Sequence, residues 1–466
     1  MFEVNELLRA TKGRLLSGKK EGGIKGISID SRTIIRGDAF IAIKGDNLDG
    51  HDFIEEAIRK GARAVVLQSQ SHPSLSLRTS KVTKSPVKIP FIGVKDTIKA
   101  LGDIARFHRR RFSLPVIAIT GSNGKTTVKD MVAWILSKRF KVLKNAGTKN
   151  NHIGLPQTLL ELDGSCEIAV VEIGTNHFGE VSYLADICLP DIGVITNIGS
   201  SHLQYFKDLK GVLKEKYTLI EHLKKPGIAL INADDVLLKG KLARTTAPPV
   251  IFGFGIKNRS DFFATDIRIL KRRIEFLVNQ KYKFTLMALG YYNIYNALVA
   301  IALGRIFGME YKDISRRLAD FIFPQGRLNF VEFNKIKFID DTYNSNPLSL
   351  RQALEALDNF RAKGRKIFIM GDMLELGSAS KAFHRQAGYR AARVCDVFIT
   401  VGKLSKFAAE AARLGGFDSK NILTCGSSLE ARDILFNKIS PGPDDIMLVK
   451  GSRAMKMEEV LRGITD

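Results

Sequence analysis

Residues 116–136, "VIAITGSNGKTTVKDMVAWIL", decide the fold, because they join an apolar run to an amphipathic pattern through a glycine-rich turn. The run at 116–119 predicts a short buried strand, and the apolar residues from Thr126 onward recur at helical spacing. Where a helix begins, backbone N–H groups are unpaired, and glycines let an anion approach the main chain closely. The stretch therefore predicts a strand, a phosphate-binding turn and a helix.

The turn also carries side chains that suit a nucleotide. Lys125 supplies a cation for the terminal phosphates, and Thr126 offers a hydroxyl to Mg²⁺. The common pattern G-x-x-x-x-G-K-[ST] needs a glycine where this chain has Ile119, so the loop is the shorter T-G-x-x-G-K-T-T, which argues against a generic GTPase or kinase loop. A turn that only joins strand to helix is the alternative. The predicted nucleotide-binding residues of the turn are Gly121, Ser122, Asn123, Gly124, Lys125, Thr126 and Thr127.

Length and charge bound the possible functions. A chain of 466 residues with 45% apolar residues is long enough for two to four domains. The formal charge of +24 indicates anionic partners, such as nucleic acid, a membrane surface or small phosphorylated and carboxylated substrates. The basic residues are scattered in short groups without a long basic arm, which favours solvated faces, and we expect no nucleic-acid partner.

Cysteine usage and the N-terminus indicate the compartment. The four cysteines are widely spaced without a C-x-x-C pair, so we expect reduced core thiols and neither a zinc site nor a disulfide framework. The N-terminal residues lack the apolar core of a signal peptide, and no run of about eighteen uncharged apolar residues occurs. We expect a cytoplasmic protein with no stable membrane insertion.

Alternating strand and helix patterns predict an α/β fold in three blocks, at residues 1–113, 114–324 and 325–466. The first block has strand patterns at 40–43, 64–67 and 91–94, a polar excursion at 68–88 and a helix at 97–112. The middle block adds strands at 168–173, 192–198 and 227–231, which predict a parallel sheet with its chemistry at the carboxyl ends. The last block has strands at 337–339, 366–370, 397–401 and 446–449, which predict a second open α/β sheet.

Two side chains follow strands of the middle block. Glu172 lies near the end of one strand, and His202 follows another, so both are expected at the sheet edge where the phosphate loop opens. With Thr126 they form a plausible set of direct or water-mediated Mg²⁺ ligands. A single Glu or His is more often structural, and their shared position is what favours a site. Lys216, by itself, looks like one more surface lysine on a helix.

At the level of whole motifs, the chain resembles the Mur ligase family, ATP-dependent enzymes that build the peptide of bacterial cell-wall precursors. The resemblance covers nearly the full chain. It rests on "TGSNGKTT", "NNHIGLPQTLLEL", "EIGTNHFGEV", "SHL", "GYYNIYNAL" and "IDDTYNSNPLSL". It implies an N-terminal domain that grips a UDP-sugar, a central parallel-sheet P-loop ATPase-like domain, and a C-terminal Rossmann-like domain that closes over the nucleotide.

Three further stretches are similar to the family members that add D-alanyl-D-alanine to UDP-N-acetylmuramoyl-tripeptide. They are "DSRTIIRGDAFIAIKGDNLDGHDF", "MGDMLELG" with His384 following, and "LVKGSRAMKMEEV". The Asp-Asn-Pro-Arg element of the members that add the third amino acid is not in the sequence. The resemblance implies phosphoryl transfer from ATP to the tripeptide carboxylate, an acyl phosphate, and attack by the dipeptide amine. It implies ATP and two Mg²⁺ as cofactors, these small molecules as partners, and a monomer.

The resemblance also assigns roles to individual residues. Lys216 is implied to be carbamylated by CO₂ and thereby to become an anionic Mg²⁺ ligand, which requires a neutral amine first. The other implied roles are adenine contact for Asn293, phosphate contact for Arg327, ribose contact for Asp341, UDP-sugar contact for Ser31 and Arg32, muramoyl-peptide contact for Asn151, and dipeptide contact for Asn344, Asn346 and Ser349. For these last three, turn asparagines and a helix N-cap are equally good explanations.

The sequence departs from the family pattern at three positions. Thr218 stands where a Glu commonly follows the key lysine, Tyr292 where a His is common, and Gln204 where a Glu is common. Two rival functions also stay open. A folylpolyglutamate synthase-like ligase shares the loop and chemistry but typically lacks the "DSR…GDAF" domain, and a nucleic-acid-dependent ATPase is suggested only by the charge.

Overall fold

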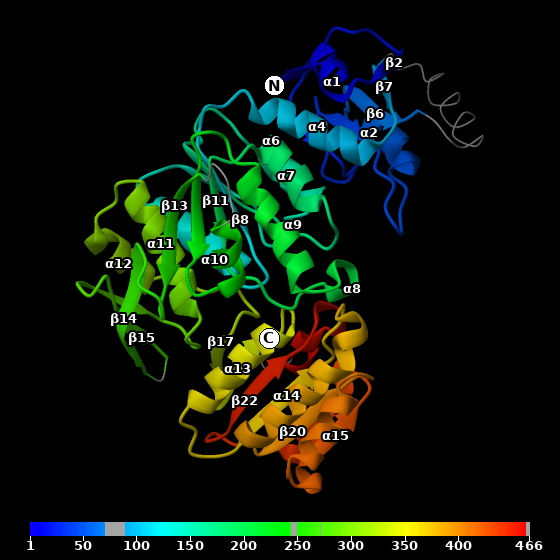
Figure 1. Ribbon diagram of the computed structural model, residues 1–466. Helices are drawn as coiled ribbons and strands as arrows, with labels where there is room; N and C mark the ends of the chain where they lie inside the picture. The colour runs from blue at the N-terminus through cyan, green and yellow to red at the C-terminus, as the bar shows by residue number, and fades with distance from the viewer. Residues whose placement is uncertain (70–88, 244–248, 271, 463–466) are drawn as a thin grey trace.

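The computed structural model describes residues 1–69, 89–243, 249–270 and 272–462. The chain forms α/β layers around three main sheets, which follow one another from the blue N-terminal part through the green middle to the yellow and red C-terminal part (Figure 1). The α/β fold is thus as the sequence predicts. Of the polar excursion expected at 68–88, Gln68 is the last residue of a strand, and residues 70–88 lie outside the described residues.

The N-terminal part has a five-stranded sheet. Its order is β2 (Arg14–Ser17), β7 (Phe91–Val94), β6 (Ala64–Gln68), β5 (Ala39–Ile41) and β4 (Ile27–Ser28), all parallel except the β2–β7 pair. Alternate strand residues point to opposite faces, so α1 (Val4–Thr11) and α4 (Thr97–Arg109) pack on one face and α2 (Ile54–Arg59) on the other. The short strands β1 (Phe2–Glu3) and β3 (Gly23–Ile24) pair beside them.

The central sheet has nine strands. In spatial order they are β16 (Tyr282–Leu286), β15 (Ile274–Val278), β14 (Phe262–Ile269), β13 (Val250–Gly255), β12 (Ile228–Asn232), β11 (Ile192–Ile195), β8 (Val116–Thr120), β10 (Ile168–Glu172) and β9 (Val142–Lys144). The strands from β14 to β9 are parallel, as predicted, whereas β14–β15 and β15–β16 are antiparallel. This antiparallel extension was not predicted from the sequence.

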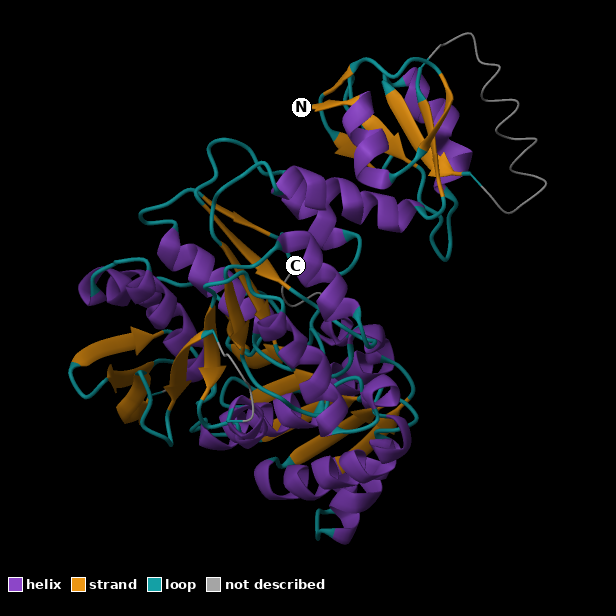
Figure 2. Cartoon of the chain, turned by 45° about the horizontal axis from the view of Figure 1, so that its top comes forward, coloured by secondary structure: helices purple, strands orange, loops and turns teal. Residues whose placement is uncertain are grey.

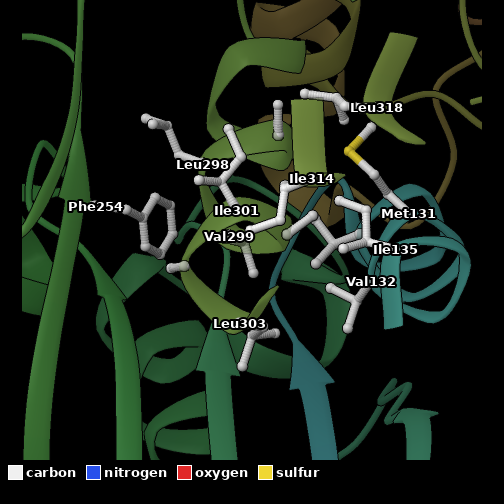
Figure 3. Close-up of a cluster of buried hydrophobic side chains, with 14 of the residues drawn as sticks. Met131, Val132, Ile135, Phe254, Leu298, Val299, Ile301, Leu303, Ile314 and Leu318 are labelled. Atoms are coloured by element: carbon white, nitrogen blue, oxygen red, sulfur yellow. The ribbon is translucent and has the colours of Figure 1, made fainter. Parts of the chain in front are cut away.

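Helices cover both faces of the central sheet (Figure 2). They are α5 (Lys125–Leu136), α6 (Gly154–Leu160), α7 (Glu180–Cys188), α8 (Leu203–Phe206), α9 (Leu209–Glu221), α10 (Val236–Leu242), α11 (Asn293–Ile306) and α12 (Tyr311–Ala319). On one face Met131 and Ile135 of α5 meet Ile301 of α11 and Ile314 of α12 (Figure 3). α11 is apolar nearly all round, as expected of a helix buried inside a core.

The C-terminal sheet has six strands. Their order is β17 (Asn329–Phe333), β18 (Ile336–Asp341), β22 (Ile446–Lys450), β19 (Lys366–Gly371), β20 (Val397–Val401) and β21 (Ile422–Cys425), parallel except for β17. The helices are α13 (Pro347–Asn359), α14 (Ser380–Val394), α15 (Lys406–Leu414) and α16 (Ser428–Asp433). The four strands predicted here are all present.

Two other expectations can be compared with the structure. Cys188, Cys395 and Cys425 are buried free thiols and Cys166 is a half-buried one. The strand predicted at 192–198 ends at Ile195, because the polar residues after it bond to the phosphate loop instead of continuing the ladder. Among the described residues, no helix combines the length and the apolar character that crossing a membrane requires.

Candidate active site

The turn at 121–124 has a backbone that only glycine accommodates at two positions. Gly121 has φ +143° and Gly124 has φ +83°. A Cβ at Gly121 would lie 1.9 Å from Thr196 Oγ1, and one at Gly124 would lie 2.5 Å from Asn296 Oδ1. Since α5 begins at Lys125, the turn presents its backbone N–H groups at a helix N-terminus, which is the geometry that binds phosphate.

The turn is held by the loop that follows β11. Thr196 Oγ1 donates to Asn123 O at 2.5 Å, and Asn123 N donates to Asn197 Oδ1 at 3.0 Å. Ser122 Oγ donates to Gly199 O at 3.0 Å and accepts from Gly199 N at 2.9 Å. The anion-binding backbone is therefore fixed before any ligand arrives, which is what electrostatic preorganisation requires.

Lys125 folds back over the turn. Its Nζ donates to Gly121 O at 2.9 Å, and its side chain lines the cavity described next. Burial lowers the pKa of Lys125, while Glu172 acts in the opposite direction and Arg327 adds to the lowering. A triphosphate placed on the turn would offer this buried ammonium a counter-charge in addition to that of Glu172.

A cavity of about 590 Å³ lies between the central sheet and the C-terminal part. Most of the residues proposed from the sequence line it, and they come from both sides. They are Ser122, Asn123, Gly124, Lys125, Thr126, Thr127, Asn151, Glu172, His202, Arg327, Asp341, Asn344, Asn346 and Ser349. Segments more than two hundred residues apart in the sequence thus converge on the predicted phosphate loop.

Glu172, the last residue of β10, presents one carboxylate oxygen without a partner. Its Oε1 accepts from Asn150 Nδ2 at 2.6 Å, whereas Oε2 is buried and has no hydrogen-bond partner among the described residues. A buried carboxylate oxygen left unpaired is costly, so a cation at this place would stabilise it. Carboxylate and hydroxyl oxygens are what Mg²⁺ prefers, and Thr126 Oγ1 lines the same cavity, 3.2 Å from Arg327 Nη2. The donor set fits a divalent cation.

A buried network holds Glu172 in place. Lys129, fully buried on α5, donates from Nζ to Asn145 O and to Gly147 O, both at 2.8 Å. The Asn145 side chain accepts from Glu172 N at 2.9 Å and donates to Glu172 O at 3.2 Å. Neither Lys129 nor Asn145 was predicted from the sequence, because their partners lie elsewhere in the chain.

His202 follows β11 and contacts the C-terminal part. Its Nδ1 lies 2.6 Å from Oε2 of Glu375, a residue the sequence analysis did not select. Both residues line the cavity with Glu172 and Lys125. The structure therefore brings Thr126, Glu172 and His202 to one cavity, as proposed from their positions after strands.

Lys216 lies on the buried side of α9 and does not line the cavity. Burial lowers the pKa of Lys216 far below its ordinary value, and the nearby Lys125 lowers it further, whereas Glu215 opposes both. Thr218, the departure from the family pattern, donates to Lys214 O at 3.0 Å within its own helix. It is therefore a helix-surface residue and takes no part in the cavity.

Asn293, for which the resemblance implies an adenine contact, is buried within the packing of α11. Its side chain is 2% exposed, donates to Leu289 O at 2.7 Å and accepts from Asn296 Nδ2 at 2.9 Å, and it lines neither this cavity nor its neighbour. Asn296, one helical turn later, lines an adjoining cavity of about 340 Å³ together with Gly124 and Tyr292. Of these two asparagines, Asn296 lines a cavity beside the phosphate loop, and Asn293 supports it from inside the helix packing.

The C-terminal side contributes charged and amide groups. Asp341 pairs with the buried Lys450 at 2.6 Å, and the Arg327 guanidinium lies 3.7 Å from the centre of the Tyr343 ring. Lys450 lines the cavity as well and was not selected from the sequence.

The three polar residues proposed for the dipeptide also have structural duties. Asn346 caps α13 in a reciprocal pair with Ser349, and its Nδ2 donates to Asn123 Oδ1 at 2.7 Å. Asn344 Oδ1 accepts from Ser345 N at 2.8 Å, and its backbone oxygen accepts from Lys450 Nζ at 2.9 Å. The N-cap and turn explanations therefore hold, and all three residues nevertheless line the cavity.

Ser31 and Arg32 lie in the N-terminal part, away from this cavity. Ser31 is buried and its Oγ donates to Glu56 Oε2 at 3.0 Å, whereas the Arg32 side chain is 82% exposed and pairs with Asp30 at 2.7 Å. Neither lines either cavity, so any role for them concerns a part of a substrate far from the phosphate loop.

Comparisons with known proteins agree with this arrangement. Family descriptions match in three consecutive segments: "Mur ligase family, catalytic domain" at 23–109, "Mur ligase middle domain" at 119–304 and "Mur ligase, glutamate ligase domain" at 326–453. The UDP-N-acetylmuramoyl-tripeptide--D-alanyl-D-alanine ligase of Bacillus subtilis is 32% identical over 468 residues, which cover 99% of this chain and 98% of that protein.

Two solved structures are similar over nearly the whole chain. A crystal structure of MurF from Acinetobacter baumannii gives a TM-score of 0.86 at 31% identity and covers 99% of this chain and 98% of its own. The MurF ligase of Thermotoga maritima, crystallised in complex with ADP, gives a TM-score of 0.80 at 28% identity and covers 94% of this chain and 96% of its own.

Proposed function

This chain belongs to the Mur ligase family, and we propose that it joins D-alanyl-D-alanine to the terminal carboxylate of UDP-N-acetylmuramoyl-tripeptide with hydrolysis of ATP to ADP. The observation that carries the proposal is the convergence of Lys125, Arg327 and the unpaired Glu172 oxygen on one cavity beside the glycine turn. That combination suits a triphosphate with a divalent cation.

The reaction we propose has two steps. The γ-phosphoryl group passes from ATP to a carboxylate oxygen of the tripeptide, which gives an acyl phosphate and ADP. The dipeptide amine then attacks the acyl carbon, loses its proton, and phosphate leaves. Lys125 and Arg327 offset the negative charge gathered when a carboxylate meets a triphosphate, and the C-terminal part covers the cavity against water.

Two Mg²⁺ ions are proposed at this cavity, where they would add positive charge around the transferred group. Thr126, Glu172 and His202 are the residues proposed to hold them, on the strength of the unpaired Glu172 oxygen and the shared cavity. A carbamylated Lys216 is proposed as a further ligand. Its amine would attack CO₂ and release a proton, and the depressed pKa of Lys216 favours the neutral amine that this step needs.

The substrates are assigned to parts of the chain as follows. We propose ATP on the turn at 121–127 with Arg327 and Asp341, and the adenine in the adjoining cavity that Asn296 lines. Ser31 and Arg32 are proposed to contact the UDP-sugar, Asn151 the muramoyl-peptide, and Asn344, Asn346 and Ser349 the entering dipeptide. Domains at 1–113, 114–324 and 325–466, a monomeric state and a cytoplasmic location complete the proposal.

The test is ADP release by the whole chain with UDP-muramoyl-tripeptide, in the presence and absence of D-alanyl-D-alanine. We expect turnover only when both are present. Faster turnover with a folate and glutamate would favour the folylpolyglutamate synthase-like alternative, and ATP hydrolysis that requires DNA or RNA at physiological salt would favour the nucleic-acid-dependent one.

A further inference from the structure

The contact between His202 and Glu375 joins two parts of the chain at the edge of the proposed metal site. Nδ1 of the imidazole and Oε2 of the carboxylate are 2.6 Å apart, although the two residues are 173 positions apart in the sequence. A carboxylate that accepts a hydrogen bond from Nδ1 fixes the ring so that Nε2 carries the lone pair, which is the arrangement found behind many metal-ligating histidines.

Glu375 is held rigidly by its own loop, which follows β19. Asp372 Oδ1 accepts from Ser405 N at 2.7 Å, Ser452 Oγ accepts from Leu374 N at 2.8 Å, and His384 Nε2 accepts from Met373 N at 3.0 Å. Each of the three residues before Glu375 is thus tied to a different neighbouring element, and the loop has little freedom to place the carboxylate elsewhere.

The backbone conformations on both sides are unusual. Glu375 has φ +61° and His202 has φ +52°, in the left-handed region that non-glycine residues seldom occupy. Such conformations persist where the surroundings impose them, and they concentrate at functional sites. A second bond crosses the same contact, because Gln204 N donates to Glu375 O at 3.0 Å. The main chain therefore places both partners and does not leave the contact to two mobile side chains.

The charges agree with this geometry. A carboxylate at this distance is the acceptor for the hydrogen bond that an Nδ1–H of His202 donates. The Nε2 atom of His202 has no hydrogen-bond partner among the described residues. His202 lines the same cavity as Glu172 and Thr126, so this atom is free to bind a cation there.

We propose that Glu375 is a positioning residue that orients His202 for metal binding, so that the metal site of the central part is complete only when the C-terminal part is docked against it. This inference rests on the proposed function, because it takes His202 as a metal ligand. Docking of the C-terminal part would then complete the metal site in addition to excluding water from the cavity.

The experiment measures Mn²⁺ binding to the whole chain in the presence of ADP, by electron paramagnetic resonance of the free ion. We expect Glu375→Ala to weaken Mn²⁺ binding about 10- to 100-fold, the usual effect of removing a group behind a metal ligand. Glu375→Gln, which keeps an acceptor oxygen, should restore part of the affinity. His202→Ala should weaken binding at least as much, and the double variant should bind no more weakly than His202→Ala alone.

The matched control is Glu332→Gln. Glu332 pairs with Arg272 and so also joins the central and C-terminal parts, but at a different place, far from His202 in the fold. We expect this control to bind Mn²⁺ like the wild type. Equal weakening by Glu332→Gln and Glu375→Ala would overturn the inference, because Glu375 would then act only as a clamp between the two parts.

Nuclear magnetic resonance shows directly which nitrogen of the His202 imidazole carries the proton. The chain has eight histidines, so the ¹⁵N resonances of His202 can be assigned by comparison with His202→Ala. We expect Nδ1 to carry the proton in the wild type and Nε2 to carry it predominantly in Glu375→Ala. Unchanged protonation and unchanged Mn²⁺ affinity in Glu375→Ala, with weakened binding in His202→Ala, would defeat this inference alone. Unchanged Mn²⁺ affinity in His202→Ala would defeat both it and the metal assignment of the proposed function.

Discussion

The buried ammonium of Lys125 is expected to matter for activity and not for the stability of the fold. Burial lowers its pKa, which means that the fold gains little from its charge. We expect Lys125→Met to lower kcat for ADP release by at least about 100-fold, because a preorganised donor to the phosphates is lost. The melting temperature should stay the same or rise, as checked by circular dichroism.

The control for that substitution is Lys138→Met, at an exposed position just beyond the other end of α5. It removes the same charge and should leave both kcat and the melting temperature unchanged. Near-normal ADP release by Lys125→Met would contradict the assignment of the turn to ATP.

Lys216 is expected to make the free energy of unfolding rise with pH, whereas a lysine that is paired in the folded chain makes it fall. Its folded-state pKa is depressed mainly by burial, whereas the unfolded chain keeps the ordinary value of 10.5. Between these two values the unfolded chain binds more protons, so the free energy of unfolding rises with pH in that window. We expect Lys216→Met to be more stable than the wild type at neutral pH, and the difference to shrink as pH rises toward 10.5.

The measurement is urea unfolding of both proteins in CO₂-free buffer at several alkaline pH values, because carbamylation would remove the titrating amine. A stability difference that does not change with pH would contradict the lowered pKa, because it would show that Lys216 binds its proton equally in the folded and the unfolded chain over this range. Lys216→Met should also be nearly inactive in the ADP assay if the amine is carbamylated during turnover.

At the residue scale, the sequence predicted types of side chain better than their directions. Glu172 and His202 were proposed beside Thr126 of the phosphate loop because a parallel sheet brings strand ends together, a property of topology and not of contacts. The resemblance pointed to Asn293 alone, and only the packing of α11 shows that the amide of Asn296 faces a cavity. Glu375 could not be found, since nothing in its own neighbourhood in the sequence indicates a partner 173 residues away.

The turn between β8 and α5 is the element on which the proposed site depends most. We expect Gly121→Ala to abolish nucleotide binding, measured by fluorescence of a labelled ADP, because its Cβ would collide with Thr196 Oγ1 in addition to straining the backbone. Gly147→Ala is the matched control, since Gly147 has φ +52° but open space where a Cβ would be.

The control should lose only about 1 kcal/mol of stability, the cost of the left-handed conformation for a residue with a Cβ. Nucleotide binding by Gly121→Ala at wild-type affinity would mean that the loop after β11 can move aside, and that the turn is less rigid than its hydrogen bonds indicate.

At the element scale, the predicted strands lie close to the observed ones because each is a short apolar run between turn residues. Other strands were not predicted, among them β9, β13, β17 and β21, and for β14 to β16 there is a physical reason. They alternate buried and more exposed residues and sit at one end of the sheet, so they lack the continuous apolar run of a strand covered on both faces. Their pattern is that of antiparallel strands, which the sequence analysis did not test for in this block.

On the scale of the whole molecule, the order of the parts was predictable and their contacts were not. Three alternating series of strands and helices indicate three sheets. The bonds that unite the central and C-terminal parts, such as Asn123 with Asn346 and Thr126 with Arg327, each join residues about two hundred positions apart. The spacing of apolar residues in the sequence does not indicate such distant pairs, so the cavity between the parts is known only from the structure.

A substitution of Arg32 tests whether the N-terminal part binds the UDP-sugar of the substrate. Its guanidinium is exposed, pairs with Asp30, and lies on a part of the chain that does not line the cavity of the phosphate loop. If it contacts the UDP-sugar far from the reacting carboxylate, that contact has the same strength in the ground state and in the transition state. Arg32→Ala should then raise KM for UDP-muramoyl-tripeptide about 10-fold while kcat and the KM for ATP stay unchanged.

Arg59→Ala, at another exposed arginine of the same part, is the control and should alter none of these constants. A fall in kcat without a change in KM would contradict this prediction, because it would place Arg32 in the chemical step. Since Arg32 lies away from the cavity, the N-terminal part would then have to move against the central sheet during turnover.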